Sequence, residues 1–222
     1  SAEETTSILS SAADIHRQYG STFPALYGLV ADVFLRKNNL AADSLAAVAV
    51  KNHRHALTNK HAQFHKELTL EDVARSASIA PPLRILDCSP ISDGAAALVL
   101  SSRPHPEKAR IIGTGHGQDS MLLSDRKEVD EFHATRRAAA QAFATARLTP
   151  AEISVAEVHD CFTIAECIAL ADLGFFSAYE AGMAALRGHS THGGKIVINP
   201  SGGLKACGHP VGATGVKQVA YL

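Results

Sequence analysis

A stretch rich in glycine and proline, residues 198–215, constrains the fold of this chain more than any other. It reads Ile-Asn-Pro-Ser-Gly-Gly-Leu-Lys-Ala-Cys-Gly-His-Pro-Val-Gly-Ala-Thr-Gly, with five glycines and two prolines in eighteen residues. Such a composition does not suit the interior of a regular helix or strand. The β-branched residues 195–198 before it predict a buried strand, and the apolar residues 216–222 after it predict a helix. The stretch is therefore predicted to be a turn between a strand and a helix.

The turn carries one imidazole, His209, between Gly208 and Pro210. Ligands in layered α/β folds bind where strands end and helices begin, and free N–H groups at a helix start bind oxyanions. A histidine in a stiff turn suits a general base near neutral pH. The alternative is a structural turn in which His209 only caps a neighbouring group. We favour the functional turn, because loops on a rigid scaffold carry most binding and catalytic residues.

A second group of reactive side chains follows a predicted short strand, residues 151–158. It consists of His159, Asp160 and Cys161. His159 and Cys161 alternate along the strand end, so both are predicted to face one site. Taken alone, Cys161 would be read as a buried structural thiol, and Asp160 as a helix cap.

Four blocks of the sequence together resemble the thiolase family, in the form of its SCP2-thiolase branch. Asn-Pro-Ser-Gly-Gly-Leu-Lys-Ala-Cys-Gly-His-Pro-Val-Gly-Ala-Thr-Gly at 199–215 resembles the GHP signature, and His-Asp-Cys-Phe at 159–162 resembles the HDCF motif. Residues 86–97 resemble the strand with the SDGAAA sequence, and Lys-Asn-His-Arg-His-Ala at 51–56 resembles the KNHxHA segment. The blocks follow the family order across most of residues 24–222.

The resemblance implies an α/β fold, the five-layered α/β/α/β/α thiolase sandwich of two related halves. On that template residues 1–82 are a loop-domain segment that covers the coenzyme A site. Residues 83–106 end the N-terminal half, and residues 107–222 form a truncated C-terminal half. The family's nucleophilic cysteine is expected to precede residue 1, and the last strands to follow residue 222, so the chain is expected to be a fragment or part of a longer protein.

The resemblance also assigns roles in acyl transfer between a cysteine thiol and coenzyme A. His209 would activate the nucleophile and help to bind a thioester oxygen, while His159 would be an oxyanion donor. Cys161 would be the acid/base thiol, and Ser89 would touch the pantetheine arm. We add the paired glycines Gly202 and Gly203 as residues that let the backbone approach the substrate.

The predicted function is therefore a thiolase-type acyltransferase that cleaves 3-ketoacyl-CoA, or condenses acyl-CoA, through a cysteine acyl-enzyme. Three alternatives stay open. Cys207, two residues before His209, is a substitute candidate for the nucleophile. The protein could be an inactive acyl-CoA- or lipid-binding relative, or a carbon–carbon lyase of the same branch. The sequence does not fix acyl chain length or the direction of the reaction.

Composition limits the partners. The formal net charge is −1, with 46% hydrophobic and 19% charged residues, which is typical of a soluble globular protein and gives no sign of a nucleic-acid surface. No apolar run is long enough to span a membrane. Coenzyme A and its acyl esters are the expected partners, as substrates and with no bound cofactor. The family implies a homodimer or homotetramer in fatty acid metabolism, in peroxisomes, glycosomes or mitochondria, or in the cytoplasm of a prokaryote.

Two further patterns suggest ligands but are rejected. The histidines of residues 53–65 (His53, His55, His61 and His65) are a weak metal-site candidate, since their neighbours are cationic and repel a divalent ion. A solvated or phosphate-facing loop fits them better, and we predict no metal site. The Gly-x-Gly-x-Gly at 113–117 lacks the helix start and the acidic residue of a dinucleotide site.

The remaining pattern predicts secondary structure. Strands are expected at 84–87, 94–100 and 109–117, besides those at 151–158 and 195–198. Thr163 and Glu166 are expected to form a capping box at the start of a helix. Residues 175–194 are expected to be a connection. The predicted helices span 23–37, 45–51, 69–77, 130–148, 164–173 and 216–222.

Overall fold

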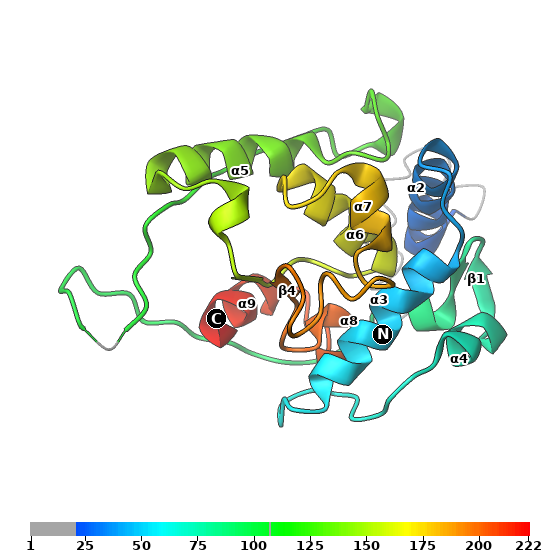
Figure 1. Cartoon of the computed structure of the whole chain (residues 1–222), viewed down its shortest axis with the longest axis horizontal. Helices are drawn as coiled ribbons and strands as arrows, with labels where there is room; N and C mark the ends of the chain where they lie inside the picture. Colours follow the sequence, from blue (N-terminus) through cyan, green and yellow to red (C-terminus); the bar gives the residue numbers. More distant parts are fainter. Residues whose placement is uncertain (1–20, 107) are drawn as a thin grey trace.

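The structure, a computed structural model, describes residues 21–106 and 108–222 (Figure 1). Helices account for most of its regular structure. In chain order the elements are α2 (Phe23–Lys37), α3 (Asp43–Ala56), α4 (Leu70–Arg75), β1 (Ser78–Ala80), β2 (Leu83–Arg84), η2 (Ile85–Asp87), η3 (Leu123–Asp125), α5 (His133–Ala146), η4 (Pro150–Glu152), β3 (Val155–Ala156), α6 (Thr163–Asp172), α7 (Ala178–Met183), β4 (Val197–Ile198), α8 (Gly203–Cys207) and α9 (Thr214–Tyr221).

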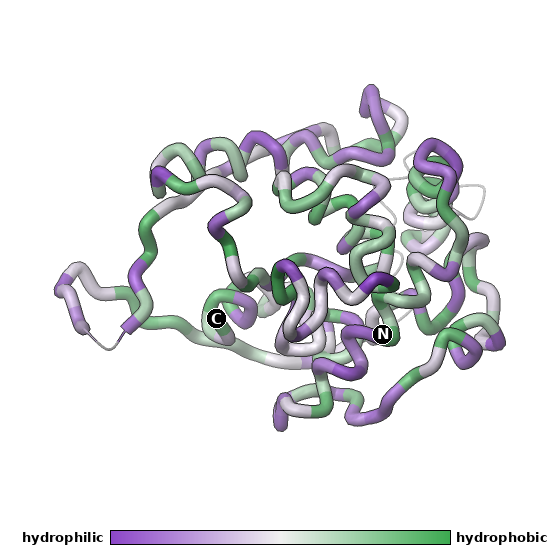
Figure 2. The backbone as a smooth tube through the Cα atoms, viewed as in Figure 1, coloured by the Kyte–Doolittle hydropathy of each residue, from purple (hydrophilic) through white to green (hydrophobic). Residues whose placement is uncertain are grey.

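Helix α6 lies at the centre, and α2, α3, α5 and α7 pack around it (Figure 1). Its sequence, TIAECIALAD, is apolar on nearly every side, as expected for a helix surrounded by protein. Ile164, Cys167 and Ile168 are fully buried. In Figure 2 this part of the chain is largely hydrophobic, while α5 alternates between hydrophobic and hydrophilic residues along the outside. The helices that pack around α6 come from both halves of the sequence, so both halves contribute to the core.

The beginning of α6 differs from the prediction. Phe162 is the N-cap and Thr163 is already helical, with its hydroxyl donating to Asp87 Oδ1 at 2.9 Å. Glu166 does not close a capping box, because its carboxylate is fully buried and pairs with Lys51 Nζ at 2.9 Å. The prediction of a capping box was wrong, because a tertiary charge partner took the place of the local backbone donor.

The other helices follow the predicted positions, with some changes in length. Helix α2 has the predicted bounds. Helix α3 runs five residues beyond its predicted end, to Ala56, and residues 175–194 contain the additional helix α7. No helix among residues 21–106 and 108–222 combines the length and the apolar character that a membrane crossing needs.

The described strands are short and form two separate pairs. β3 and β4 are parallel, with Val155 opposite Val197 and Ala156 opposite Ile198. β1 and β2 are antiparallel. The predicted strands at 151–158 and 195–198 thus shrink to two residues each, but they lie side by side as an α/β fold requires. The predicted strand at 84–87 is mostly the 3-10 turn η2.

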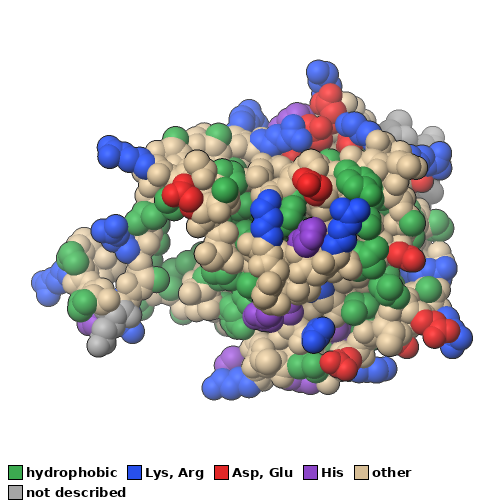
Figure 3. Space-filling view, viewed as in Figure 1, with side chains coloured by type: hydrophobic (Ala, Val, Ile, Leu, Met, Phe, Trp, Pro, Cys, Tyr) green, Lys and Arg blue, Asp and Glu red, His purple; other side chains and the backbone are tan. Residues whose placement is uncertain are grey.

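The predicted strands at 94–100 and 109–117 do not form. Both segments are extended but unpaired, and the residues that join them, 101–106 and 108, stand away from the body (Figures 1 and 3). A strand needs a neighbouring strand for its N–H and C=O groups, and none of the described strands pairs with these two segments. Gly113, Gly115 and Gly117 instead lie against the backbone of α5, where a side chain would collide with the helix. This close packing explains the Gly-x-Gly-x-Gly pattern without a dinucleotide.

Candidate active site

The glycine-rich stretch forms the predicted turn, with one short helix inside it. After β4, Asn199 has a left-handed backbone (φ 53°), and Gly202 and Gly203 are left-handed as well. These turns start helix α8, which ends at Gly208. His209 and Pro210 follow, and α9 then begins at Thr214. The stretch therefore changes direction twice and leaves His209 in the turn between two helices.

Two imidazoles meet at this turn. The rings of His159 and His209 are edge to face, with their centroids 4.9 Å apart. The backbone N–H of His209 donates to Ser92 Oγ at 3.0 Å, and Ser92 Oγ donates to Gln63 Oε1 at 2.6 Å. Three of the sequence blocks, at 86–97, 159–162 and 199–215, therefore converge at one place. His159 and His209 come together as their predicted roles require.

The pKa values of both histidines are lowered, so both rings are neutral at pH 7. Burial is the main cause for His209, and His159 and Lys217 add to it, which lowers the pKa of His209 to about 4. For His159 desolvation comes first and the charge of Lys217 second. His159 is exposed to solvent on one side, but the surrounding protein still removes part of its hydration. Neutral imidazoles can accept a proton or donate an N–H to an oxyanion.

Cys161 does not join the two histidines on an open surface. It is 3% exposed and packs in the same apolar cluster as Phe162 and Tyr27. Burial raises the pKa of Cys161 to about 12. The thiol is therefore a protonated group of the core, and its role as acid/base stays a prediction. The other core thiols behave alike: burial raises the pKa of Cys88 to about 12 and raises that of Cys167.

Asp160 is a helix cap, but of α8 rather than of α6. Its carboxylate accepts hydrogen bonds from the backbone of Leu204 at 2.6 Å and of Lys205 at 3.2 Å, and from Asn52 Nδ2 at 2.7 Å. Burial and the nearby Glu166 carboxylate raise the pKa of Asp160 to about 7, against these hydrogen bonds. Asp160 thus ties the HDCF segment to the start of the glycine-rich turn.

Gly202 and Gly203 face the protein interior. A side chain at Gly202 would meet Ala56 on α3, and one at Gly203 would meet the Asp160 carboxylate. Both positions also have a positive φ. These contacts explain why glycine occupies both positions without any ligand, so their predicted contact with substrate stays a prediction.

Ser89 lies beside the HDCF segment. Its N–H donates to the carbonyl of Cys161 at 2.9 Å, next to the antiparallel bridge between Cys88 and Phe162. It is partly buried and does not line either of the two cavities described below. Its predicted contact with the pantetheine arm stays a prediction.

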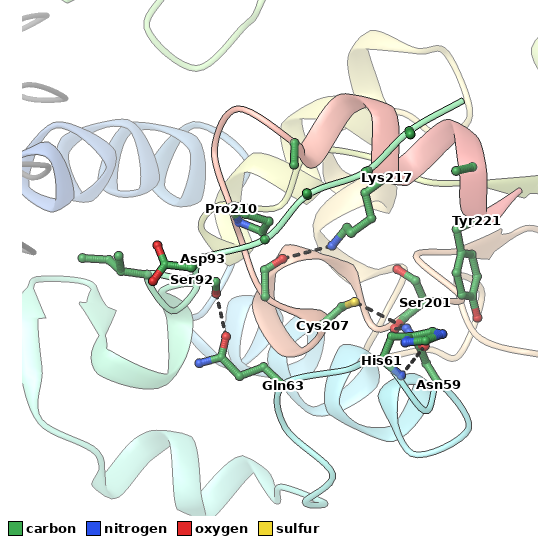
Figure 4. A pocket seen from close by; sticks show the side chains of 18 residues that line it. Asn59, His61, Gln63, Ser92, Asp93, Ser201, Cys207, Pro210, Lys217 and Tyr221 are labelled. Atoms are coloured by element: carbon green, nitrogen blue, oxygen red, sulfur yellow. Dashed lines mark hydrogen bonds between the residues drawn. The ribbon is translucent and has the colours of Figure 1, made fainter. Parts of the chain in front are cut away.

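A cavity of about 760 Å³ lies next to the GHP turn (Figure 4). Asn59 and Cys207 lie on one side of it and Ser92 on another, with Asn59 Nδ2 donating to Cys207 Sγ at 3.4 Å. Lys217 reaches across its edge and donates to the carbonyl of Gly208 at 3.0 Å. A second cavity of about 440 Å³ is bordered by His159, by the charged side chains of Asp119, Arg126 and Glu157, by Thr135, and by the apolar or aromatic side chains of Tyr27, Phe132, Ala134, Val158, Ala165, Ala169 and Leu173.

The histidines of residues 53–65 are not one solvated loop, so that interpretation was wrong for half of them. His53 and His55 lie on α3 and are 4% and 3% exposed. Their Nδ1–H groups donate to the carbonyls of Lys66 at 2.8 Å and Asn199 at 3.1 Å. His61 and His65 are exposed. Within the two described ranges, no three His, Cys, Asp or Glu side chains are grouped to hold a metal ion.

Three polar residues of the site were not predicted from the sequence. Ser92 holds the backbone of His209, Asn59 contacts Cys207, and Thr214 contacts the His209 ring. Ser92 and Thr214 stand inside the recognised blocks, so a hydroxyl within a glycine-rich motif was the available signal. No such signal marked Asn59, because its partner Cys207 lies 148 positions further along the chain.

Comparison with known proteins identifies the family of the chain. The thiolase N-terminal domain model matches residues 8–104, and the model described as thiolase C-terminal domain-like matches residues 115–220. The chain belongs to the thiolase superfamily, in its SCP2-thiolase branch. The predictions of the family and of the thiolase fold are confirmed.

Individual relatives place the chain more closely. It is 43% identical over 210 residues to an acetyl-CoA acetyltransferase of Methanothermobacter thermautotrophicus, covering 92% of this chain and 55% of that one. It is 35% identical to sterol carrier protein 2 of Bos taurus, covering 90% and 38% respectively. Among solved structures, the Ltp2-ChsH2(DUF35) aldolase superposes with a TM-score of 0.76 at 24% identity, over 88% of this chain and 53% of that one, which shows the shared fold. The chain spans about half the length of the acetyltransferase and a smaller share of sterol carrier protein 2.

Proposed function

We propose that this chain is part of a thiolase-type acyltransferase that cleaves 3-ketoacyl-CoA or condenses acyl-CoA through a cysteine acyl-enzyme. The observation that carries the proposal is the edge-to-face pair of neutral histidines, His159 and His209. His209 would take the proton of the nucleophilic thiol, and His159 would donate an N–H to the thioester oxygen. The family and its acetyl-CoA acetyltransferase relatives support this chemistry.

The electrostatics of the pair suits these roles. A general base must be unprotonated when the substrate arrives, and the lowered pKa of His209 keeps it so across the neutral range. An oxyanion donor is most effective where the surrounding protein limits access of water to the oxyanion. His159 borders the second cavity, although one side of its ring is exposed. We propose that this cavity receives the acyl part, because most of its lining is apolar.

The nucleophile is proposed to lie outside these 222 residues. Cys88, Cys161 and Cys167 have raised pKa values, so their reactive thiolate forms are scarce at neutral pH. Cys207 borders the larger cavity, but its sulfur accepts a hydrogen bond from Asn59, and none of the described histidines accepts a hydrogen bond from its thiol. Cys207 is therefore the less favoured nucleophile.

Intact mass spectrometry of the polypeptide as expressed, before and after incubation with acetyl-CoA or acetoacetyl-CoA, tests the proposal. An acetyl adduct that is labile to hydroxylamine, on a cysteine outside this sequence, is the expected result. Replacing His209 with glutamine should then slow adduct formation by about a hundredfold or more, because the thiol loses its base. An adduct that maps to Cys207 would overturn the division of roles.

The second candidate is an inactive thiolase-like protein that binds acyl-CoA or lipid. The relatives named sterol carrier protein 2 favour it. It predicts saturable binding of an acyl-CoA in calorimetry, with no adduct and no release of coenzyme A. A homodimer or homotetramer, and a place in fatty acid metabolism in one of the compartments expected above, are proposals that rest on the family alone.

A further inference from the structure

The hydroxyl of Thr214 lies between two partners at the base of the site. Its Oγ1 is 2.8 Å from His209 Nδ1 and 3.0 Å from the carbonyl oxygen of Pro210. Thr214 is 1% exposed, so water does not compete for these groups. Its position one helical turn after Pro210 lets the side chain reach back to that carbonyl, as serine and threonine do in helices.

The chemistry of the three groups selects one arrangement of protons. A carbonyl oxygen only accepts hydrogen bonds, whereas a hydroxyl donates one and also accepts. If the Thr214 hydroxyl donates to Pro210, its oxygen is free to accept an N–H from His209 Nδ1. Both short distances are then hydrogen bonds in one continuous chain, in which each bond polarises the next.

The other tautomer of His209 satisfies fewer groups. With the proton on Nε2, the Thr214 hydroxyl would have to donate to Nδ1, and its 3.0 Å contact with Pro210 would carry no hydrogen. The Nε2–H would then need an acceptor, and none of the residues in the two described ranges makes a hydrogen bond or ion pair with that nitrogen. His209 is half-buried and its Nε2 is not one of the buried side-chain atoms that lack a partner, so an N–H there would bond to water. The two tautomers therefore differ in the hydrogen bond from Thr214 to Pro210, which only the Nδ1–H form keeps.

We propose that Thr214 is a positioning residue that holds His209 as its Nδ1–H tautomer, leaving the Nε2 lone pair as the only basic atom of the ring. Thr214 thereby does with a neutral hydroxyl what a carboxylate does in a Ser-His-Asp triad. A hydroxyl fixes the tautomer and the ring orientation but adds no negative charge. The imidazolium form is therefore not stabilised, which fits a ring whose titratable neighbours are His159 and the cation Lys217. The use of Nε2 as a base rests on the proposed function, but the tautomer itself does not.

The direct test is the tautomer of His209 in solution. Long-range ¹H–¹⁵N correlation spectra of the ¹⁵N-labelled polypeptide at pH 7.5 distinguish a protonated from an unprotonated ring nitrogen, and His209→Gln identifies the signal. We expect a protonated Nδ1 and a bare Nε2 in the unmodified protein. An Nε2–H tautomer there would overturn the proposal, because the tautomer is read in the unmodified protein and the variant serves only to assign the signal.

Variants separate the hydroxyl from the shape of the side chain. Thr214→Val keeps the shape and removes the hydroxyl, so both tautomers should appear, whereas Thr214→Ser should restore the single one. The matched control is Thr163→Val on α6, which removes another buried hydroxyl, one that donates to Asp87. It should leave the His209 signal unchanged. A valine variant that is folded and keeps a pure Nδ1–H tautomer would also overturn the proposal.

Acyl transfer gives a second readout. In the polypeptide that carries the nucleophile, Thr214→Val should lower the rate of acetyl adduct formation by between about ten- and a hundredfold, and Thr214→Ser should recover most of it. If the unmodified protein forms no adduct but shows the Nδ1–H tautomer, the proposed function fails and the role of Thr214 stands. If it forms the adduct with an Nε2–H tautomer, the reverse holds.

Discussion

Two regions of this molecule differ in which kind of side chain they bury. The polar core, defined as Lys51, Asn52, Asp160, Glu166 and Asn199, joins α3, α6 and the glycine-rich turn, and all five side chains are buried. The excursion, residues 89–106 and 108–122, is extended and largely exposed, with apolar side chains such as Val99 at 93% exposure. The polar core thus buries charged side chains, whereas the excursion exposes several apolar ones.

The difference shows that the partners of a residue, more than its polarity, decide where it lies. Lys51 donates to the Ile198 carbonyl at 2.9 Å as well as pairing with Glu166, and Asn199 Nδ2 donates to the same carboxylate at 2.9 Å. Buried charges are tolerated when they are paired and hydrogen-bonded. The excursion has the composition of strands, but no neighbouring strand among the described residues supplies its hydrogen bonds. The polar core therefore holds the site in place, and the excursion contributes little stability outside the parts that pack on the body, such as residues 113–117 on α5.

The largest effect should come from breaking the charge pair of the polar core. Lys51→Met keeps most of the side-chain volume but leaves Glu166 without its counter-charge. We expect a loss of about 3–5 kcal/mol in the free energy of unfolding, measured by urea denaturation, because an uncompensated buried charge is costly.

Two further variants make this prediction specific. Arg36→Met breaks the exposed pair with Asp32 on α2, where the Arg36 side chain is 80% exposed, and should change stability by less than about 0.5 kcal/mol. Combining Lys51→Met with Glu166→Gln should recover part of the loss, because no charge is then buried alone. If Lys51→Met and Arg36→Met cost the same, the polar core does not stabilise the fold as described.

A glycine of the turn gives the next effect. Gly203→Ala forces a side chain into a left-handed residue (φ 62°) and against the Asp160 carboxylate that caps α8. The matched control is Gly193→Ala, also left-handed (φ 82°) but with nothing within 4 Å of the added carbon. We expect about 1–2 kcal/mol for Gly193→Ala from backbone strain alone, and about 3 kcal/mol for Gly203→Ala. Equal losses in thermal or urea unfolding would show that Asp160 does not constrain this position.

The same two regions show how far sequence reasoning reached. The helices of the interior were predicted well because their apolar residues recur at helical spacing, as in α2. The convergence of His159 and His209 was predicted from the family motifs, which encode a tertiary arrangement that local patterns do not. Spacing alone would have left His209 as one imidazole in a turn.

The failures have two physical causes. Glu166 has the local pattern of a capping residue, but Lys51, 115 positions earlier, provides a stronger partner in the folded chain. The excursion has the β-branched and small residues of strands at 94–100, but strand formation depends on a neighbour that a sequence window does not contain. A helix can be predicted from its own residues, because its backbone hydrogen bonds are local. Strands and buried charges depend instead on partners that are distant in the sequence.

The histidines of α3 connect the polar core to pH. In the folded chain burial, together with the charges of Lys205 and Lys51, lowers the pKa values of His53 and His55 from 6.5 to about 4. Between these values the unfolded chain binds protons that the folded chain does not, so stability falls as pH drops from about 6.5 to 4. Each histidine contributes a slope of about 1.4 kcal/mol per pH unit.

Asp160 acts in the opposite sense. Its raised pKa lets the folded chain bind a proton below about pH 7 while the unfolded carboxyl stays ionised to about pH 4, so it adds stability as pH falls. Urea titrations between pH 7.5 and 4.5 measure these opposing contributions. His55→Asn should flatten the profile and Asp160→Asn should steepen it. Profiles that both variants leave unchanged would contradict these assignments.

The smallest effect is expected on the excursion, and one substitution compares the two regions directly. Val48 on α3 is 1% exposed and Val99 is 93% exposed. Changing valine to threonine keeps the shape and adds a hydroxyl, so at Val48 a polar group is buried among apolar neighbours at a cost of about 1–3 kcal/mol. At Val99 the hydroxyl is solvated in both states, and the change in the free energy of unfolding should stay within about 0.5 kcal/mol. A loss at Val99 as large as that at Val48 would show that the excursion is packed against something in solution, and the contrast between the two regions would no longer hold.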